Sequence, residues 1–291
     1  NYGCDIRSID AIAASDDVDA VAICTPTDTH ADLIEQFAGA GKAVFCEKPI
    51  DLDLERVKDC LKTVSEENAT LMVGFNRRFD PDFMTLKKAI DDGKIGDVEM
   101  VTICSRDPGA PPAEYIKVSG GIFRDMTIHD FDVARWLLGE EIATVQAAAS
   151  VLTDPEIGKL GDYDSVNVIL TTESGKQCTI TNSRRATYGY DQRIEVLGSK
   201  GSVAAENMRE ANIVLADESG FHQPPLLDFF MTRYIAAYAN EIAGFVAAVS
   251  GKTATPTTGH DGMVALALAD AALLSVAEQR VVKLSELKVS T

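Results

Sequence analysis

The alternation of apolar strand-like runs with helix-like segments in the first 75 residues constrains the fold of this chain more than any other feature. Residues 18–24 (VDAVAIC) form a continuous apolar run, as expected of a parallel strand that is buried on both faces. The predicted elements are, in order, a strand over 4–7, a helix over 9–14, a strand over 18–24, a helix from 28 or 29 to 40, a strand over 43–46, a helix over 54–67 and a strand over 70–74. This order predicts a doubly wound parallel sheet.

Polar residues follow the last three of these strands. They are Thr25 and Thr27, Glu47 and Lys48, and Asn76 and Arg77. Ligands of doubly wound sheets bind outside the carboxyl ends of the strands. The sequence therefore predicts a ligand site at this edge of the sheet.

The pattern changes after Pro81, where a second domain of α+β type is predicted. Its expected elements are a helix over 83–91, strands over 98–104, 144–152, 165–172, 176–184, 192–197, 202–205 and 213–216, and helices over about 228–250 and 262–279. Glycines between the later strands favour short turns and an antiparallel sheet. We expect a first domain over 1–75 and a second over 76–291, which carries a large, open, mostly antiparallel sheet. Because an open sheet face exposes apolar side chains, we expect face-to-face pairing into a dimer or tetramer.

Composition and charge disfavour several classes of function. The 291 residues include 27 Lys and Arg against 45 Asp and Glu, a formal net charge of −18. Such a chain repels phosphates, so we expect no nucleic-acid partner and no membrane-surface role. No apolar run reaches the roughly 18 residues of a membrane span, and no signal peptide is visible. The six cysteines lack metal-ligand spacing, so we expect no metal and a reduced, cytoplasmic protein, with Cys24, Cys46, Cys104 and Cys178 in the core.

The stretch from Gly120 to Gly139 carries the clearest candidate for catalysis. Apolar residues recur there at helical spacing, and Gly139 is placed to end the helix. Asp125, His129 and Asp132 lie at i, i+4 and i+7 on the other face. A carboxylate one turn before a histidine can hold one ring nitrogen and leave the other free to move a proton. An ordinary helix start with a structural Asp–His pair fits the same pattern, so this stretch alone leaves both interpretations open.

Several segments together resemble the glucose–fructose oxidoreductase/inositol dehydrogenase (Gfo/Idh/MocA) family. Glu47-Lys48-Pro49 after a parallel strand is a family-level motif, and a large open sheet follows the stretch that ends in His129. Residues 75–80 (FNRRFD), 105–108 (SRDP) and 120–130 (GGIFRDMTIHD) resemble the inositol-oxidising members, and the resemblance covers essentially the whole chain. It implies an oxidoreductase that uses NAD to oxidise a cyclic polyol, myo-inositol to 2-keto-myo-inositol, by hydride transfer.

The resemblance implies roles for individual residues in catalysis. His129 is expected to be the base, with a pKa near neutrality and within hydrogen-bond reach of the reacting hydroxyl. Asp125 is expected to orient His129 and to accept a substrate hydroxyl. Lys48 is expected to stabilise the developing alkoxide or to hold a hydroxyl.

The resemblance also implies contacts with cofactor and substrate. The residues expected at the nicotinamide end of NAD are Thr25, Pro26, Thr27, His30, Glu47 and Lys48. The positions that resemble substrate contacts are Arg78, Thr127, Tyr188 and Tyr234. Three alternatives stay open: His30 could equally face solvent, Arg77 or Arg78 could be structural salt-bridge partners, and the sequence does not separate Tyr188 from Tyr190.

The chain departs from the family at its start. The family's first strand, its Gly-x-Gly-x-x-Gly turn and its acidic ribose-binding residue would precede Asn1, and no segment here replaces that turn. We therefore expect a truncated Rossmann-type sheet whose strand over 18–24 has an unpaired edge, and an enzyme impaired in NAD binding. The functions left open are oxidation of myo-inositol, oxidation of scyllo-inositol or a hexose, and non-catalytic sugar binding by a remnant without the cofactor turn. The joint presence of Lys48, Asp125 and His129 favours an enzyme.

Overall fold

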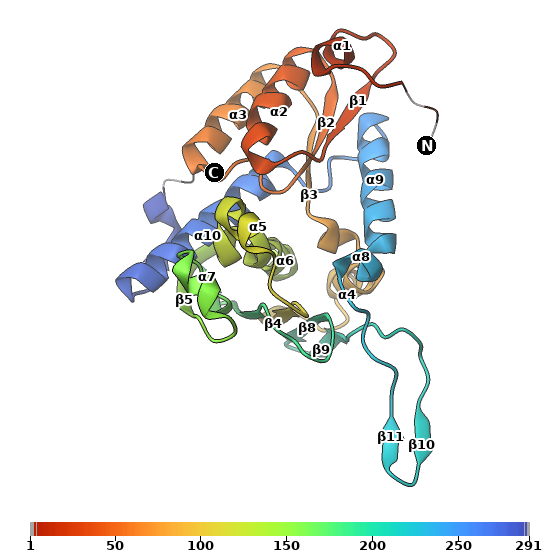
Figure 1. Cartoon of the computed structure of the whole chain (residues 1–291), viewed down its shortest axis with the longest axis vertical. Coiled ribbons are helices and arrows are strands. Elements are labelled where there is room, and N and C mark those ends of the chain that lie inside the picture. Colours follow the sequence, from red (N-terminus) through yellow and green to blue (C-terminus); the bar gives the residue numbers. More distant parts are fainter. Residues whose placement is uncertain (1–2, 4, 288, 290–291) are drawn as a thin grey trace. The chain divides into compact units, whose positions relative to one another are not determined.

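The chain divides into two compact units. The structure is a computed structural model that describes residue 3, residues 5–287 and residue 289. Unit 1 comprises Asn1–Phe75 and Glu241–Leu266, and unit 2 comprises Asn76–Asn240 and Ala267–Thr291 (Figure 1). The expected second domain over 76–291 is therefore corrected, because the segment 241–266 returns to unit 1.

Unit 1 is built on a parallel sheet of three strands in the order β1-β2-β3. Its elements are α1 Ile9–Ala13, β1 Ala20–Ile23, the 3₁₀ turn η1 Thr27–Thr29, α2 His30–Gly39, β2 Ala43–Glu47, α3 Leu54–Glu66 and β3 Leu71–Gly74. The predicted alternation from residue 9 to residue 74 is confirmed. The strand predicted over 4–7 is wrong for residues 5–7, which lie outside any strand, and Cys4 lies outside the described residues.

Helical segments lie on both sides of this parallel sheet. α2 and α3 pack against each other, and α2 also contacts β1 and β2. The returning segment 241–266 packs on the same sheet, where the rings of Phe45 and Phe245 lie 5.8 Å apart and Gly262 lies against Ile50 and Val73. Buried parallel strands need cover on each face, which gives a physical reason for the return of this segment.

The strand β1 is less buried than its apolar run predicts. It pairs with β2 on one side, and no other described strand borders its second edge. Ala22 and Cys24 are exposed, so the predictions of burial on both faces and of a core position for Cys24 are wrong. The reason is that an edge strand leaves one flank open to solvent. The other three cysteines predicted in the core are buried: Cys46, Cys104 and Cys178.

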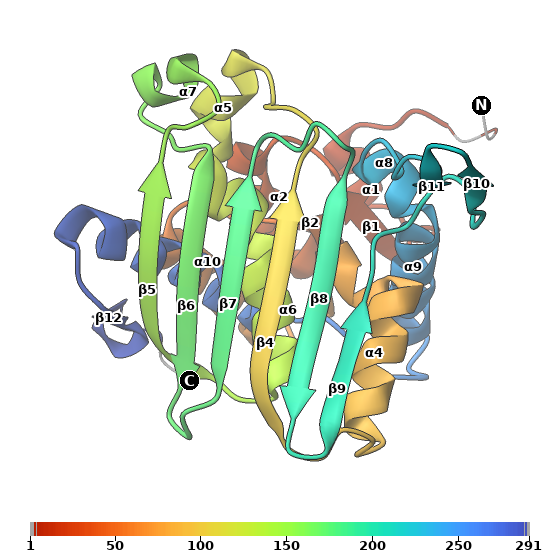
Figure 2. The ribbon, with the colours of Figure 1, turned by 90° about the horizontal axis from the view of Figure 1, so that it is seen from below.

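Unit 2 is built on a seven-stranded sheet in the order β12-β5-β6-β7-β4-β8-β9 (Figure 2). The strands are β4 Val98–Arg106, β5 Ile142–Ser150, β6 Ser165–Thr172, β7 Gln177–Ser183, β8 Asp191–Gly198, β9 Gly201–Ala205 and β12 Val282–Lys283. Only β4 and β7 pair in parallel among the neighbours in this sheet of described residues. The predicted mostly antiparallel sheet is confirmed.

One face of the seven-stranded sheet carries helices and the other is open. α4 (Pro81–Asp91) contacts β9, and α6 (Ile128–Leu138) contacts β4 and β7. In Figure 2 the open face is turned to the viewer, with these helices behind the strands. Pairing aligns a row of exposed side chains on that face: Gln146, Ile169, Thr179, Thr102 and Glu195. The expectation of an apolar face is therefore wrong for this row, in which Ile169 is the one apolar member.

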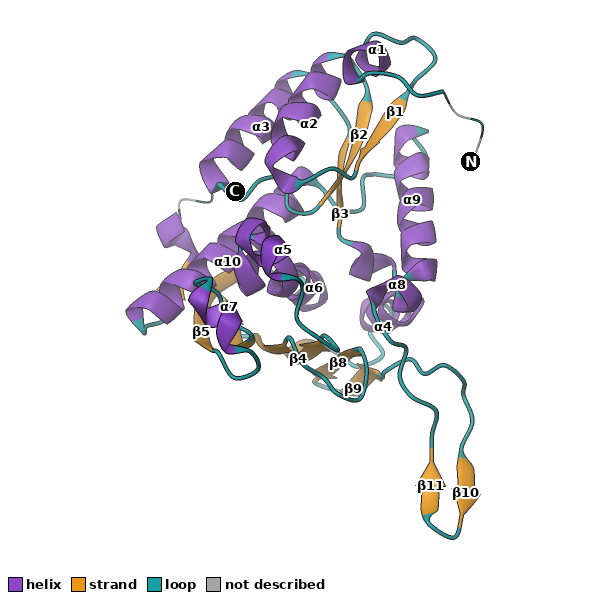
Figure 3. Cartoon of the chain, viewed as in Figure 1, coloured by secondary structure: helices purple, strands orange, loops and turns teal. Residues whose placement is uncertain are grey.

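Several elements of unit 2 differ from the predicted pattern. α5 (Ala113–Ser119) and α7 (Pro155–Lys159) lie in stretches for which no element was predicted. The helix predicted over 228–250 is divided into α8 (Phe230–Arg233) and α9 (Ile235–Val249). The strand predicted over 213–216 belongs to a separate hairpin of β10 (Leu215–Asp217) and β11 (Gly220–His222). Figure 3 shows this hairpin as an arm that extends away from the sheet of its own unit.

The last long helix, α10 (Gly259–Glu278), is apolar along most of its length. By length and composition it passes the test for a membrane-spanning helix, with a mean hydropathy of 1.4 over the best window. However, 61% of that window is buried inside the protein. Such burial is typical of the core helix of a globular domain.

Candidate active site

The predicted cofactor residues of unit 1 lie at the carboxyl ends of two neighbouring strands. β1 and β2 pair in parallel with Ile23 beside Cys46, so the loops that follow them emerge together. In the first loop Thr25 and Pro26 are exposed, and Thr27 is half-buried at the start of η1. Glu47 ends β2, and both Glu47 and Lys48 are half-buried. The structure thus brings these predicted residues to one edge of the sheet.

Glu47 is held in a confined position at this edge. It is paired with Gly74 of β3, and a Cβ at Gly74 would come within 3.0 Å of Glu47 Oε2. Burial raises the pKa of Glu47, while the electrostatic effects of Lys48 and His30 act in the opposite direction. The carboxylate is therefore closely packed against the backbone of β3 on one side, with Lys48 as the next residue.

His30 is buried at the start of α2, with 1% of its surface exposed. Its Nδ1 lies 2.8 Å from the carbonyl oxygen of Pro49, and its Nε2 lies 2.8 Å from the carbonyl oxygen of Thr25. The alternative in which His30 faces solvent is therefore wrong. Its contact with a cofactor stays a prediction.

In unit 2 the segment that carries Asp125 and His129 is helical, but its first part is a π-helix. Gly120 and Gly121 have positive φ values of 80° and 82°, after which residues Phe123–Thr127 form the π-helix and α6 begins at Ile128. A π-helix bonds residue i to residue i+5, so it breaks the regular i, i+4 spacing on which the predicted stripe rests. Such segments are frequent at functional sites.

Asp125 lies in a cluster of polar side chains from three segments. The Tyr115 hydroxyl donates to Asp125 Oδ1 at 2.8 Å, and the fully buried Arg184 lies 3.4 Å from Asp125 Oδ2. Arg184 also lies 3.6 Å from Asp162, which accepts the Ile122 N–H. Burial, and then the charge of Asp125, raises the pKa of Tyr115, so the phenol stays a donor. The sequence did not single out Tyr115 or Arg184; the paired arginines at 184 and 185 were the available signal.

His129 is half-buried in the first turn of α6. Tyr115 and Arg184 contact Asp125, and these contacts do not test whether Asp125 orients His129. That role of Asp125 stays a prediction. The alternative of an ordinary helix start is weakened by the π-helix and by the strong polar cluster around Asp125.

Asp107 belongs to the same electrostatic neighbourhood. It follows β4, where its N–H donates to Ser183 and its carbonyl accepts from Ala186. Burial raises the pKa of Asp107 to about 6, against the opposing charges of Arg184 and Arg77 and with the help of Asp125 and Asp130. A carboxyl with this pKa can donate a hydrogen bond in its protonated form below about pH 6 and only accepts in its ionised form above it. The sequence placed Asp107 in a family motif but assigned it no role.

A buried network lies directly after His129 in the sequence. Asp130 is fully buried and forms an ion pair with Arg77, and it accepts from Ser105 Oγ at 2.7 Å and from Asn182 Nδ2 at 2.8 Å. Thr127 is also fully buried, with its hydroxyl 2.6 Å from Asn182 Oδ1. The hydroxyl of Thr127 thus donates inside the protein, and the predicted substrate contact by Thr127 stays a prediction.

Arg78 is engaged in the same way. Its Nε and one terminal nitrogen reach the two oxygens of Asp132 at 2.8 and 2.5 Å, and Asp132 is buried. This fork-like pair is a strong structural contact. The alternative that Arg77 and Arg78 are salt-bridge partners is confirmed for both. The predicted substrate contact by Arg78 stays a prediction.

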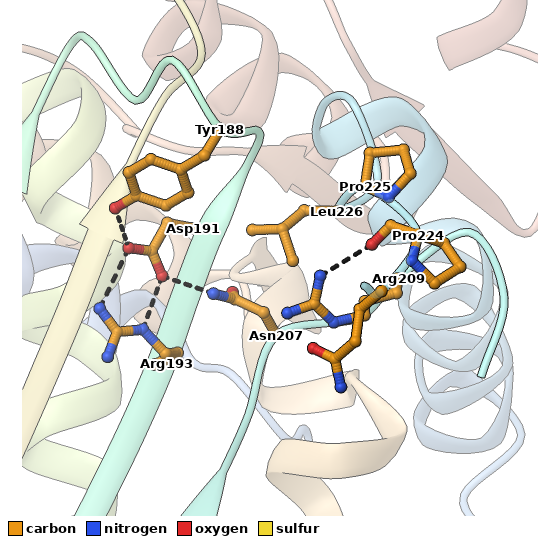
Figure 4. A pocket seen from close by; sticks show the side chains of 9 residues that line it. Tyr188, Asp191, Arg193, Asn207, Arg209, Pro224, Pro225 and Leu226 are labelled. Atoms are coloured by element: carbon orange, nitrogen blue, oxygen red, sulfur yellow. Dashed lines mark hydrogen bonds and ion pairs between the residues drawn. The ribbon is translucent and has the colours of Figure 1, made fainter. Parts of the chain in front are cut away.

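The structure separates the three candidate tyrosines. Tyr190 and Tyr234 are buried, with perpendicular rings 6.0 Å apart. Tyr188 is half exposed and lines a cavity of about 480 Å³ (Figure 4). There its hydroxyl donates to Asp191 at 2.5 Å, and Arg193 and Asn207 also bind Asp191. The lining groups largely satisfy one another, so this cavity offers few free polar groups to a polyol.

Two family models match the chain. Residues 2–75 match the model described as "Oxidoreductase family, NAD-binding Rossmann fold", and residues 83–204 match the "GFO/IDH/MocA C-terminal domain". Together they cover the parallel sheet of unit 1 and most of the large sheet of unit 2.

Individual proteins are similar over nearly the whole chain. An inositol 2-dehydrogenase of Rhizobium meliloti is 68% identical, over 98% of this chain and 86% of its own length. A myo-inositol 2-dehydrogenase of Thermotoga maritima is 49% identical, over 92% of this chain and 80% of its own length. The solved structure of a scyllo-inositol dehydrogenase from Lactobacillus casei, with bound NAD(H) and scyllo-inositol, is 30% identical with a TM-score of 0.88, and the match covers 96% of this chain and 82% of that one.

Proposed function

Since this chain belongs to the Gfo/Idh/MocA family of oxidoreductases, we propose that it uses NAD to oxidise myo-inositol to 2-keto-myo-inositol. The observation that carries this proposal is the 68% identity, over 98% of the chain, with an inositol 2-dehydrogenase. Oxidation of scyllo-inositol is the second candidate, because a similar solved structure holds scyllo-inositol with NAD(H).

The strand ends of unit 1 fit the nicotinamide end of NAD. The exposed Thr25 and Pro26 offer a surface beside the sheet edge, and the Glu47 carboxylate can accept hydrogen bonds from ribose hydroxyls. We assign Thr25, Pro26, Thr27, Glu47 and Lys48 to this end of the cofactor. When bound, NAD supplies the acceptor for a hydride.

Side chains of this chain take the proton from the reacting hydroxyl and stabilise the negative charge that develops on its oxygen. In the reaction a ring C–H bond breaks and its electron pair leaves as hydride, while the hydroxyl on that carbon loses its proton and a carbonyl forms. His129 takes this proton at a ring nitrogen. Lys48 donates to the oxygen on which negative charge develops.

Asp125 and its neighbours are assigned to the substrate. Asp125, held by Tyr115 and Arg184, accepts a hydrogen bond from a ring hydroxyl and orients His129. Asp107 lies in the same electrostatic neighbourhood and can bind a second hydroxyl in either protonation state. The buried Tyr234 and the half-exposed Tyr188 remain proposed contacts. A polyol requires many such groups, since each buried unpaired hydroxyl costs roughly 1–3 kcal/mol.

The substrate is tested by initial rates with the purified chain. We expect kcat/KM to be highest for myo-inositol among myo-inositol, scyllo-inositol and glucose, with NAD preferred to NADP. A higher value for scyllo-inositol or glucose selects the second candidate. Binding of inositol by calorimetry without any reduction of NAD supports the non-catalytic remnant and overturns the proposal.

We also propose a cytoplasmic homo-oligomer. A reduced compartment agrees with the free thiols of the described cysteines, four of which are buried. The open face of the seven-stranded sheet is the surface assigned to contact with a second copy, through mixed polar and apolar side chains.

A further inference from the structure

The imidazole of His30 faces two hydrogen-bond acceptors and no donor in its two nitrogen contacts. Each ring nitrogen lies 2.8 Å from a backbone carbonyl oxygen, of Pro49 at Nδ1 and of Thr25 at Nε2. A neutral imidazole has one N–H and one lone pair, so one nitrogen would direct its lone pair at a carbonyl. In a residue with 1% of its surface exposed, water has little access to relieve such a contact. Two N–H donors satisfy both carbonyls.

The surroundings of His30 carry the charge that an imidazolium needs. Glu47 ends the strand that leads to Pro49, and the electrostatic effect of His30 lowers the pKa of this carboxyl against the larger effect of burial. Lys48 is a second cation near Glu47. A second carboxylate acts on this region, since Glu47 and the buried Glu241 both affect Cys24, which precedes Thr25. These carboxylates offset part of the cost of burying the imidazolium.

The two carbonyls that His30 holds belong to the loops of the candidate cofactor edge. Thr25 lies two residues after β1, and Pro49 lies directly after Lys48. On the other side of Lys48, Glu47 is fixed by its pairing with Gly74. The backbone of Lys48 is thus anchored by a strand on one side and by the Pro49 contact on the other.

We propose that His30 is a doubly protonated positioning residue that joins the loops after β1 and β2 and so fixes Lys48 and Glu47. It acts through these residues and needs no contact with the substrate. The role in catalysis rests on the proposed function of Lys48, whereas the doubly protonated state does not. A positioning error of about 1 Å can cost on the order of 10²-fold in rate.

The first test is an NMR measurement on the unmodified chain with ¹⁵N-labelled histidine. His30 is assigned by the signal that disappears in His30→Asn, and the exposed His222 serves as the internal reference. We expect both ring nitrogens of His30 to show N–H character at pH 7.5. One N–H and one unprotonated nitrogen at His30 would overturn the proposal.

The second test measures positioning in His30→Asn, which keeps one donor and one acceptor. We expect faster amide hydrogen exchange over residues 47–51, unchanged exchange in α3, and kcat lowered roughly 10- to 100-fold with the KM for NAD changed less. His222→Asn on the arm is the control and should change none of these. Unchanged exchange over residues 47–51 would refute the positioning role, whatever the activity. If exchange rises but neither His30→Asn nor Lys48→Ala changes kcat, the proposed function of Lys48 fails and the positioning role stands.

Discussion

Gly121 lies so close to Asp162 that a Cβ at Gly121 would come within 2.7 Å of Asp162 Oδ1. The same oxygen accepts the Ile122 N–H at 2.9 Å, at the entrance to the π-helix. Gly121 also has a φ of +82°, a backbone conformation that residues with a side chain rarely adopt. The contact therefore ties the start of the candidate catalytic segment to a distant loop, and it requires glycine for two separate reasons.

Gly121→Ala is expected to destabilise the protein by more than the backbone conformation alone. The positive φ costs roughly 1–3 kcal/mol for a residue other than glycine. The displaced carboxylate adds to this loss, because it holds the Ile122 N–H and lies beside Arg184. Urea unfolding gives the comparison with Gly161→Ala, where φ is +80° but no atom lies within 4 Å. An equal decrease in the free energy of unfolding for the two variants would show that the contact with Asp162 does not contribute to stability.

Asp130→Ala is expected to lower the free energy of unfolding by roughly 3–5 kcal/mol. The substitution leaves the Arg77 guanidinium buried without its counter-charge, and it removes an acceptor from Ser105 and Asn182. The matched control is Glu141→Ala, which breaks the half-exposed pair with Arg135 and should cost no more than about 1 kcal/mol. Denaturant titrations of both variants at one pH provide the measurement. A loss of 1 kcal/mol or less for Asp130→Ala contradicts the prediction.

Asp107 should make the protein less stable as the pH rises from about 4 to about 6. Burial raises the pKa of Asp107 in the folded protein to about 6, above its ordinary value of 3.8. The folded state then binds more protons than the unfolded state, so raising the pH through this window reduces stability. We expect Asp107→Asn to remove this pH-dependent contribution, which amounts to roughly 1–3 kcal/mol. The stability of Asp107→Asn relative to the unmodified chain should therefore be higher at pH 7 than at pH 4. Thermal unfolding of both proteins at pH 4 and at pH 7 gives the stability of Asp107→Asn relative to the unmodified chain. The prediction fails if this relative stability is the same at both pH values.

His129→Ala is expected to reduce kcat for inositol oxidation roughly 10²- to 10⁴-fold, as loss of a general base does. Lys48→Ala is expected to reduce kcat roughly 10²- to 10³-fold through lost charge stabilisation. Lys58→Ala serves as the control, since Lys58 pairs with Glu55 on the same helix. Steady-state rates and circular dichroism separate lost chemistry from lost folding. Retention of more than a tenth of kcat in His129→Ala would assign the base to another group.

The open sheet face should mediate self-association. We expect light scattering at micromolar concentration to give a dimer or tetramer. We expect Ile169→Asp to weaken association at least tenfold, because it places a charge between Gln146 and Thr179 on this face. Val118→Asp, at an exposed site on α5, is the control. A monomeric unmodified chain at this concentration argues against the proposed oligomer.

The local pattern of the sequence was sufficient for the helices and strands that bury a regular apolar face. The strand–helix alternation from residue 9 to residue 74 and the antiparallel strands of unit 2 follow from periodicity, which is written along the chain. The motif Glu47-Lys48-Pro49 and the helical segment around Asp125 and His129 were visible for the same reason. They depend on neighbours in sequence.

The tertiary structure decided which polar residues are available for chemistry. Arg78 is bound to Asp132 across 54 positions, and Thr127 is bound to Asn182 across 55, so the partners of both residues lie far outside their local sequence pattern. The π-helix, the exposure of Cys24 and the return of residues 241–266 to unit 1 were likewise beyond the sequence pattern. The physical reason is that the cost of burying a polar or apolar group depends on partners brought together only by folding.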